Sequence, residues 1–400
     1  MSSTTADAKA IATSQAKERL IRFLESNNRL ELPRPAVPRL SILLVLYNRA
    51  ELTLSCLRSL KPRLAEVDAE VVLVDNASLD ETGTLLDRLI GVTVIRNCDN
   101  RGFPKAVNQA AEAASGEFLL LLNNDTEVLG DSLGVALRFL EANPDVGAAG
   151  GRIILLDGTL QEAGCTFWRE GHSFQYGRGD NPTAPQYMYQ RDVDYCSAAF
   201  LMTRRELFAQ MGGLDLAFSP GYFEDGDYCI RLWKSGRRVV FLPDVAIIHF
   251  ENASSDSGNN THALYHKNHP YFVKKNADWL ALQGPFGTPH LAMRSSHDDR
   301  FRVLYLPKRA RGQAPQWKRV VQELQSRNCF VTVYPIHSDG TLERDENVSL
   351  PPDVELLSGG RLDTLSRFLD DRRHYYDGML ASDSEIRKRL EQWLRQGEQT

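Results

Sequence analysis

The sequence predicts an α/β protein whose core is a Rossmann-like, mostly parallel β-sheet with helices on both faces. Short apolar runs alternate with helical segments between residues 40 and 125, which is the rhythm of βαβ units. The run FLLLL at 118–122 has no polar break, as expected for a strand buried on both faces. It ends abruptly in Asn123, Asn124 and Asp125, and open α/β sheets bind ligands at the carboxyl ends of their strands.

The elements of the first half follow in order. A helix rich in Ala, Lys, Arg and Glu is expected at 5–30, and the prolines of LPRPAVPR end it. Strands are then expected at 40–48, 70–78, 92–97 and 116–125. The helices between them are expected at 49–62, 79–90 and 103–114. This alternation predicts parallel strands joined by right-handed crossovers.

The second half of the sequence is less regular. Residues 177–192 are rich in Gly, Pro and Tyr and are expected to form a loop. The sequence then predicts a strand at 193–204, helices at 205–213 and 223–236, and strands within 237–250. From residue 301 a second α/β rhythm begins. We therefore expect a helical extension at 1–37, a main domain at 38–285 and a partial Rossmann-like domain at 286–400. The last is interpreted as a truncated second module, with a small packing domain as the alternative.

The composition is that of a globular protein, because 42% of the 400 residues are hydrophobic and 25% are charged. A net charge of -5 argues against a general nucleic-acid binder. No apolar run approaches the roughly 20 residues that span a bilayer, and the start MSSTTADAKA has no signal-peptide core. The six cysteines include no CxxC pair, so reduced thiols and a cytoplasmic location are expected.

Polar side chains at two strand ends form the first candidate site. Asp75 and Asn76 end the second strand, and Asn123 to Asp125 end the fourth. Such groups can accept hydrogen bonds from a base or ribose, or bind a hard cation through oxygen. The alternative is helix capping. Capping is an equally good interpretation for Asp75, but a weaker one for NND, because TEVLGD does not begin a convincing helix.

A second cluster consists of Glu224, Asp225 and Asp227 at an expected helix start. These acids suit the positive end of the helix dipole. Alternatively, adjacent carboxylates near an apolar sheet can have raised pKa values, as a general base acting on a hydroxyl requires. His249 follows an apolar strand and is either an ordinary hydrogen-bonded residue or a metal ligand together with Asp125.

The segment THALYHKNHPYFVKK sets three histidines at helical spacing among three lysines. Zinc binding is the weaker interpretation, because HExxH is absent and no acid lies among the histidines. The favoured interpretation is an amphipathic segment whose lysines meet phosphate or lipid head groups. The residues concerned are His262, His266, His269, Lys267, Lys274 and Lys275.

These motifs together match a known family. The chain contains, in this order, SILLVLYNRAELTLSCLRSL, VVLVDNASLDET, NRGFPKAVNQAAEAASGEFLLLLNNDTEV and GYFEDGDYCIRLWKSGRRVVFLPDVAIIHF. It resembles the family 2 glycosyltransferases of the A fold type, especially the rhamnosyltransferase-like bacterial enzymes that build O-antigen and related surface polysaccharides. The resemblance covers about 40–275. In multidomain members of that group a second glycosyltransferase module often follows, which would account for residues 286–400.

The resemblance implies a role for each candidate residue. Asp225 would be the catalytic base, and Glu224 would shape the acceptor site. Asp125 and His249 would bind Mn²⁺ or Mg²⁺. The nucleotide sugar would be bound by Tyr47, Asn48, Asp75, Asn76, Lys105, Asn123 and Asn124. Two positions depart from the family pattern: Asn123 stands where an acid is usual, and Ala198 stands where glycine is usual.

The implied activity is inverting, metal-dependent transfer of a hexosyl or deoxyhexosyl group from a nucleoside-diphosphate sugar, with UDP or dTDP favoured. The acceptor would be a hydroxyl of a growing, lipid-linked bacterial surface glycan. Peripheral contact with the inner face of the plasma membrane is expected, and nucleic acid is not an expected partner. A nucleotidyltransferase would show a glycine- and arginine-rich first loop, whereas this loop reads LYNRAEL. The remaining alternative is a catalytically silent scaffold module of a polysaccharide assembly complex. The aromatic loop 167–190 is expected to select the sugar.

Overall fold

A computed structural model gives the fold and describes residues 3–251, 261–287, 300–309, 317–337, 351–373 and 375–397. The chain divides into two compact units. The first comprises Met1–Pro182 and Asp192–Gln283, and the second comprises Thr183–Arg191 and Gly284–Thr400. The sequence placed residues 183–191 in the main domain, but this segment groups with the second unit, where Tyr189 packs against Phe330.

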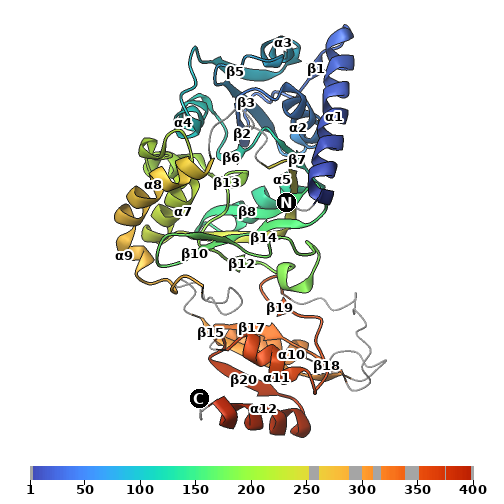
Figure 1. Cartoon of the computed structure of the whole chain (residues 1–400), viewed down its shortest axis with the longest axis vertical. Helices are drawn as coiled ribbons and strands as arrows, with labels where there is room; N and C mark the ends of the chain where they lie inside the picture. Colours follow the sequence, from blue (N-terminus) through green and yellow to red (C-terminus); the bar gives the residue numbers. More distant parts are fainter. Residues whose placement is uncertain are drawn as a thin grey trace. The chain divides into compact units, whose positions relative to one another are not determined.

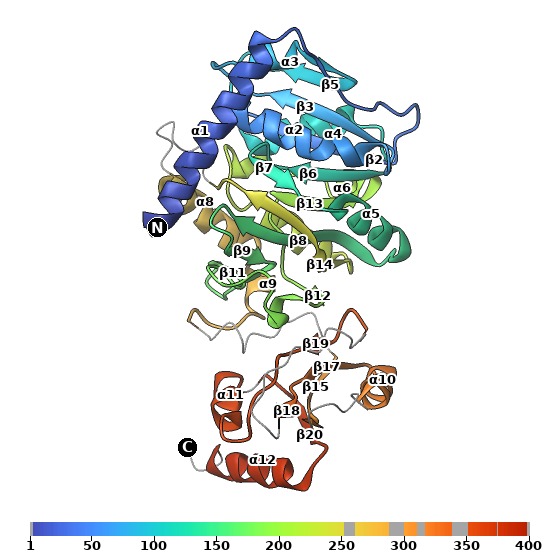
Figure 2. The same ribbon diagram turned by 90° about the vertical axis from the view of Figure 1, so that its right-hand side faces the viewer.

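The first unit is built on one mostly parallel sheet (Figures 1 and 2). Its main strands lie in the order β14-β8-β13-β6-β2-β3-β5. Neighbours on this path are parallel, except that β13 is antiparallel to both β6 and β8. The predicted α/β class with a mostly parallel sheet is therefore confirmed. The strands are β2 (Leu40–Leu46), β3 (Ala69–Asp75), β5 (Val92–Arg96), β6 (Phe118–Leu122), β8 (Val146–Leu155), β13 (Phe200–Arg204) and β14 (Arg238–His249).

Helices cover both faces of this sheet. Figure 1 shows α1, α2 and α5 on one side and α4, α7 and α8 on the other. Because successive strand residues point to opposite faces, Ile42 and Leu44 of β2 pack in the same cluster as Leu57 of α2 and Leu137 of α5. The helices of this unit are α1 (Ser3–Glu25), α2 (Ala50–Leu64), α3 (Thr82–Leu86), α4 (Phe103–Ala113), α5 (Ser132–Ala142), α6 (Arg205–Gln210), α7 (Glu224–Lys234), α8 (Thr261–Lys275) and α9 (Ala277–Leu280).

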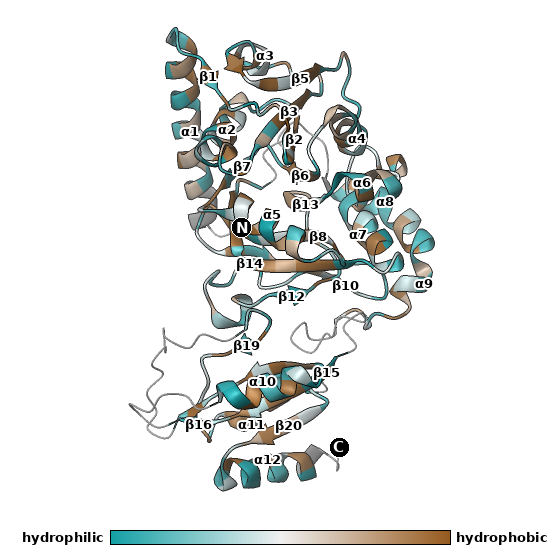
Figure 3. Cartoon of the chain, turned by 180° about the vertical axis from the view of Figure 1, so that it is seen from behind, coloured by the Kyte–Doolittle hydropathy of each residue, from teal (hydrophilic) through white to brown (hydrophobic). Residues whose placement is uncertain are grey.

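Short elements complete the first unit and extend its sheet. Strand β7 pairs with β14, and β9 pairs with β8. These short elements are β1 (Leu30–Glu31), β4 (Leu89–Ile90), β7 (Thr126–Val128), β9 (Leu160–Ala163), β10 (Cys165–Phe167), β11 (Ser173–Gln175), β12 (Arg191–Asp192) and η2 (Leu216–Phe218). The strands β2 and β3 are strongly hydrophobic in Figure 3, while the helices mix hydrophobic and hydrophilic residues. None of the helices in the described ranges combines the length and the apolar composition needed to cross a membrane.

Two elements differ from the sequence prediction. The helix expected at 79–90 is shortened to α3, because the chain after it forms β4 and pairs in parallel with β1. The strand expected at 193–204 is regular only from Phe200. The N–H groups of Ser197 and Ala198 instead donate to the carboxylates of Glu162 and Asp225, so this backbone is unavailable to a neighbouring strand.

The second unit has its own parallel sheet, in the order β19-β17-β15-β20. A buried ion pair joins Arg372 to Glu355 in this unit, with Nη2 and Oε1 2.8 Å apart. The elements are β15 (Phe301–Leu306), β16 (Lys308–Arg309), β17 (Cys329–Val333), β18 (Ile336–His337), β19 (Glu355–Leu356), β20 (Gly378–Ala381), η1 (Pro185–Tyr187), α10 (Lys318–Ser326), α11 (Leu365–Asp371) and α12 (Ser384–Gly397). This unit is thus an open α/β layer, as its sequence rhythm predicted.

Candidate active site

A cavity of about 580 Å³ lies in the first unit, at the carboxyl ends of β2, β3, β6 and β14. Residues of β9, of the first turn of α7, and of α4, β11 and α8 also line it. The volume is within the range of small-molecule sites, and the position is the one at which open α/β sheets bind ligands. The polar cluster that interrupts the apolar sequence after β6 therefore faces a cavity.

The described residues that line this cavity include five carboxylates and the imidazole of His249, but no Lys or Arg. The neighbouring segment 252–260 lies outside the described residues, and its sequence NASSDSGNN also has no Lys or Arg. A diphosphate entering this cavity without a cation would therefore meet negative charge. The carboxylates are those of Asp125, Glu162, Glu224, Asp225 and Glu251.

His249 and the residues after β6 meet at one end of the cavity. His249 Nε2 lies 3.1 Å from Asp125 Oδ1 and 3.4 Å from Asn123 Nδ2. On the other side of the ring, Nδ1 lies 2.8 Å from Gln161 Oε1. Burial alone lowers the pKa of His249, but the charge of Asp125 and more distant acids raises the pKa above its usual value overall. The structure thus brings together the two predicted metal ligands, Asp125 and His249.

This pair is an open site. Within the described ranges, no three His, Cys, Asp or Glu side chains gather into a closed metal cage. Mg²⁺ commonly uses one or two protein carboxylates and takes its other ligands from substrate phosphates and water. The carboxylate of Asp125 and the imidazole of His249 are a donor set that Mn²⁺ also accepts. The residues present therefore fit a divalent cation that binds together with a diphosphate.

The predicted nucleotide-binding residues fall into two groups. Tyr47, Asn76, Asn123 and Asn124 line the cavity. The side chain of Asn124 is also held by α2, because its Nδ2 donates to Thr53 Oγ1 at 3.0 Å. The side chains at the end of β3 alternate in direction, so Asn76 lines the cavity while its neighbour Asp75 does not.

The remaining three predicted residues do not line the cavity. Asp75 Oδ1 accepts from the N–H of Ser78 at 2.9 Å, and Asn48 Oδ1 accepts from the N–H of Leu79 at 2.8 Å. Both side chains thus hold the turn after β3. Lys105 is exposed on α4 and lies outside the cavity wall. Phe103, at the start of α4, lines the cavity, and two residues further the helix has turned by about 200°, which carries Lys105 away.

Glu224 and Asp225 begin α7 and line the same cavity. Asp225 Oδ2 accepts from the N–H of Ala198 at 3.1 Å, and Oδ1 accepts from the N–H of Gly226 at 2.8 Å. In contrast, Glu224 Oε2 is buried and has no hydrogen-bond partner among the residues that the structure describes. Burial and the charge of Asp225 raise the pKa of Glu224 to about 8, and burial also raises the pKa of Asp225. Because two N–H groups stabilise ionised Asp225, we assign the charge to Asp225 and the proton to Glu224.

The raised pKa of Glu224 predicts a pH dependence of stability. Its pKa of about 8 in the folded protein exceeds the usual value of 4.5, so between these pH values the folded state binds more protons than the unfolded state. The free energy of unfolding should therefore fall as pH rises from 5 to 8. Glu224→Gln removes this titration and should flatten the curve, as urea denaturation at each pH would measure. Parallel curves for the two proteins would contradict the assignment.

Helix α8 holds the loop that leads into α7. Asn268, which is buried, donates from Nδ2 to the carbonyls of Phe218 and Gly221, both at 2.8 Å. The loop needs such support because Tyr222 and Phe223 have φ of 78° and 76°, a left-handed conformation that non-glycine residues adopt at a cost. Helix α8, which is not part of the main sheet, thus helps to fix the start of α7 and the position of Asp225.

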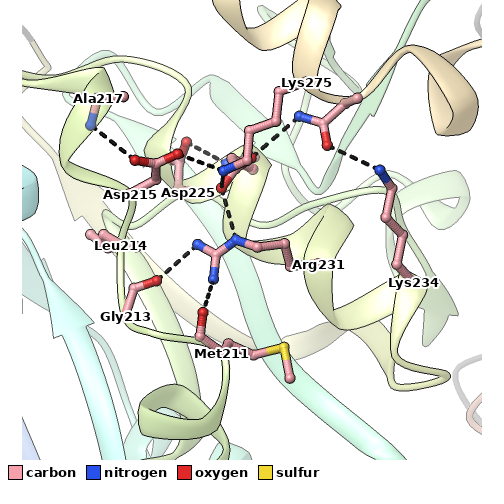
Figure 4. Close-up of polar contacts among 12 residues, drawn as sticks. Met211, Gly213, Leu214, Asp215, Ala217, Asp225, Arg231, Lys234 and Lys275 are labelled. Atoms are coloured by element: carbon pink, nitrogen blue, oxygen red, sulfur yellow. Dashed lines mark hydrogen bonds and ion pairs between the residues drawn. The ribbon is translucent and has the colours of Figure 1, made fainter.

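A buried ion-pair network joins α8 to α7 (Figure 4). Asp227 is fully buried and accepts from Arg231 Nε at 2.8 Å. Lys275 Nζ lies 2.8 Å from Asp227 Oδ1 and 2.6 Å from Asp215 Oδ2. The proposed contact of Lys275 with lipid or phosphate is therefore wrong, because its ammonium group is held between two carboxylates. Lys274 and Lys267 are exposed on α8.

The other predictions for this region have different outcomes. Zinc binding by the histidines of α8 finds no support among the described residues, and His269 Nε2 instead lies 2.9 Å from the carbonyl of Glu170. Of the aromatic residues in the loop 167–190, Phe167 lines the cavity. Tyr187 and Tyr189 belong to the second unit.

Sequence reasoning missed several cavity residues, among them Gln161 and Glu162 of β9. Both residues are buried, with 4% and 2% of their surfaces exposed. Their only sequence signal is a pair of long polar side chains in the short segment LQEA, after the turn-forming Asp157 and Gly158. Nothing in that segment indicates that β9 folds back toward His249.

Part of the chain that forms this cavity matches a known family. Residues 41–212 match the family model described as glycosyl transferase family 2. The O-antigen biosynthesis protein RfbC of Myxococcus xanthus is 30% identical over 278 residues, which is 67% of this chain and 21% of that protein. The N-acetylglucosaminyl-diphospho-decaprenol L-rhamnosyltransferase of Mycobacterium tuberculosis (strain CDC 1551 / Oshkosh) is 26% identical over 263 residues, 58% of this chain and 85% of that protein.

A solved structure is also similar. The mannosyltransferase PcManGT from Pyrobaculum calidifontis, in complex with GDP-Man and Mn²⁺, has 21% sequence identity and a TM-score of 0.43, over 69% of this chain and 73% of that chain. The present chain spans about a fifth of the length of the Myxococcus protein. The family match includes Asp75 and Asp125, whereas Asp225 and His249 follow it in the sequence. Over residues 41–212, this chain is a glycosyltransferase domain of family 2.

Proposed function

We propose that the chain transfers a sugar, with inversion, from a nucleoside-diphosphate sugar to a hydroxyl group of a growing bacterial surface glycan. The observation that carries this proposal is the side chain of Asp225, which accepts from two N–H groups in the same cavity as the Asp125–His249 pair. The names of the Myxococcus and Mycobacterium relatives support a polysaccharide precursor as acceptor and a hexosyl or deoxyhexosyl group as the transferred sugar.

In this proposal Asp225 acts as the general base. Its carboxylate takes the proton of the acceptor hydroxyl while that oxygen attacks the anomeric carbon. The bond from the anomeric carbon to the diphosphate breaks on the opposite side, and its electron pair leaves with the nucleoside diphosphate. A single displacement of this kind inverts the anomeric configuration. Glu224, which holds a proton, can donate a hydrogen bond to the acceptor but cannot compete as the base.

Asp125 and His249 are proposed to hold a Mn²⁺ or Mg²⁺ ion. When bound, the ion would stabilise the negative charge that develops on the departing nucleoside diphosphate. The support for this is the chemistry of the cavity wall. Glu224 is assigned a proton and Glu251 pairs with Arg178, but the carboxylates of Asp125 and Asp225 remain, and the described wall has no Lys or Arg to offset a diphosphate. Tyr47 and Asn76, which also line the cavity, are proposed to contact the nucleoside.

Thermal unfolding with nucleotides tests the donor and cation together. UDP, dTDP, GDP and CMP would each be added with and without Mn²⁺. A ligand at 100 times its Kd stabilises a protein by about 2.7 kcal/mol, which shifts the unfolding midpoint measurably. We expect a shift with UDP or dTDP that requires Mn²⁺ and is lost in Asp125→Ala. Asp99→Ala is the matched control, because Asp99 is exposed and lies outside the cavity wall.

A shift that is independent of Mn²⁺, or that survives in Asp125→Ala, would contradict the cation site. No shift with any nucleotide would instead favour the catalytically silent scaffold. The lipid-linked acceptor and peripheral attachment at the cytoplasmic face of the membrane remain proposals, for which Lys267 and Lys274 of α8 are the exposed cations. The second unit is likewise proposed to be part of a second glycosyltransferase module.

A further inference from the structure

We propose that Gln161 is a positioning residue, which fixes the proton of His249 on Nδ1 and so presents Nε2 to the cation held with Asp125. This inference rests on the proposed function for the cation, and goes beyond it by assigning the residue that orients one of the ligands. Gln161 does not touch the proposed reacting atoms. It acts through the imidazole ring.

The hydrogen bonds around the ring determine which nitrogen carries hydrogen. Gln161 Oε1 lies 2.8 Å from Nδ1, and a carbonyl oxygen can only accept, so Nδ1 must donate. Asn123 Nδ2 lies 3.4 Å from Nε2, and an amide nitrogen can only donate. A neutral ring therefore has hydrogen on Nδ1 and its lone pair on Nε2. If the ring is protonated, Nδ1 still donates to Gln161, and the proton displaced by a cation is the one on Nε2.

The lone pair on Nε2 also faces a carboxylate. Asp125 Oδ1 lies 3.1 Å from Nε2. Two acceptors at this separation repel each other unless a proton or a metal ion lies between them. The arrangement held by Gln161 thus makes a gap that a cation fills. In many metal sites the second ring nitrogen of a metal-binding histidine donates to a fixed acceptor. The residue that supplies this acceptor commonly tunes metal affinity.

The backbone of β9 explains how Gln161 reaches the ring. In the ladder between β9 and β8, Glu162 is opposite Ile153, and Leu160 is opposite Ile154. Gln161 therefore has no partner on β8 and is the extra residue of a β-bulge. In a regular strand Gln161 and Glu162 would point to opposite faces, but both line the cavity. The bulge thus directs the amide of Gln161 toward His249 while the carboxylate of Glu162 still lines the cavity.

The same sheet also fixes the position of His249. Strand β8 lies between β9 and β14, and its Leu155 is opposite His249 of β14. Gln161 and His249 approach each other across β8, and both are more than 90% buried, with 4% and 7% of their surfaces exposed. In such a site, the orientation of the ring depends on its few hydrogen-bond partners and not on water.

The first test determines which ring nitrogen of His249 carries hydrogen in the metal-free protein. Nitrogen-15 NMR of histidine-labelled protein distinguishes protonated from unprotonated ring nitrogens, and His249→Gln identifies the signals of His249 among the nine histidines. We expect hydrogen on Nδ1 in the wild type and in Gln161→Glu, which keeps an acceptor oxygen. In Gln161→Met, which keeps the length of the side chain but has no carbonyl, this preference should be lost.

The second test titrates Mn²⁺ alone and follows the free ion by electron paramagnetic resonance. Gln161→Met should raise the Kd for Mn²⁺ by about 10- to 100-fold, as is typical for loss of a residue that orients a metal ligand. Gln161→Glu should retain tight binding. Gln175→Met is the matched control, because Gln175 lines the same cavity but donates to Glu162 and not to His249.

The outcomes separate this inference from the proposed function. Hydrogen on Nε2 in the neutral wild type would overturn it, since the amide of Gln161 would then be donating to Nδ1. An unchanged Mn²⁺ Kd and an unchanged spectrum in a folded Gln161→Met would overturn it as well. If the wild type binds no Mn²⁺, the proposed cation site fails, and with it the second half of the inference. The metal-free spectrum would then still decide whether Gln161 sets the tautomer.

Discussion

Replacing Asp225 with Asn is expected to lower kcat by about 10²- to 10⁴-fold, the range that a positioned general base contributes. Asn has the shape of Asp but cannot take a proton from an acceptor hydroxyl. Its one carbonyl oxygen can still accept from Ala198 or Gly226, so the first turn of α7 should stay in place. The loss would be measured as the initial rate of nucleoside diphosphate release, with a lipid-linked glycan extract as acceptor and the nucleotide sugar that thermal unfolding selects.

Glu224→Gln is the matched control for this experiment. Glu224 lines the same cavity one residue earlier and is assigned the proton, so a neutral amide of the same length should reproduce its hydrogen bonding. Its kcat should fall much less than that of Asp225→Asn. Unchanged turnover in Asp225→Asn would remove the proposed base. A larger loss in Glu224→Gln than in Asp225→Asn would assign the base to Glu224 instead.

Asp227→Ala is expected to lower the free energy of unfolding by about 3 kcal/mol, the lower end of the range for breaking a buried ion pair. The side chain of Asp227 is fully buried, and its loss leaves Arg231 and Lys275 without their shared carboxylate. The lower end applies because Lys275 keeps Asp215, and Arg231 keeps the carbonyls of Met211 and Gly213 (Figure 4). Urea denaturation followed by circular dichroism would measure the change.

An exposed acid that pairs with the same helix provides the comparison. Asp278 of α9 pairs with Lys234 of α7 at 2.7 Å, and 74% of its side-chain surface is exposed. Exposed pairs contribute between 0 and about 1 kcal/mol, so Asp278→Ala should change stability far less than Asp227→Ala. Similar effects of the two substitutions would show that burial does not set the value of the Asp227 network.

The α/β class, the mostly parallel sheet and the edge of the sheet that carries the polar cluster could be predicted from the sequence. Apolar runs that end in NND or VDN are local signals, and parallel strands bring their carboxyl ends to one edge whatever the loops do. Asp125 and His249 were therefore paired correctly, although 124 positions separate them. Glu224 and Asp225 also carry a local signal, a run of acids at a helix start.

Residues whose placement depends on a local irregularity or on distant packing could not be predicted. Gln161 reaches His249 only through a β-bulge, which has no clear pattern in the sequence. Asn268 and Lys275 are on α8, about 50 residues after the loop and the acids that they hold. Lys105 shows the opposite error, because the motif around it is at the site, while the turn of α4 directs its own side chain to solvent.

The absence of Lys and Arg from the described wall of the cavity affects which concentration of the donor sets the rate of transfer. Under the proposed function, a nucleotide sugar and its cation would arrive as one species, so saturation should follow the concentration of that complex and not the total nucleotide. Free diphosphate, which retains its charge, would be repelled by the ionised carboxylates of the wall, such as those of Asp125 and Asp225, and would compete poorly. In the cell, a supply of divalent ions would then limit transfer in the same way as a supply of activated sugar.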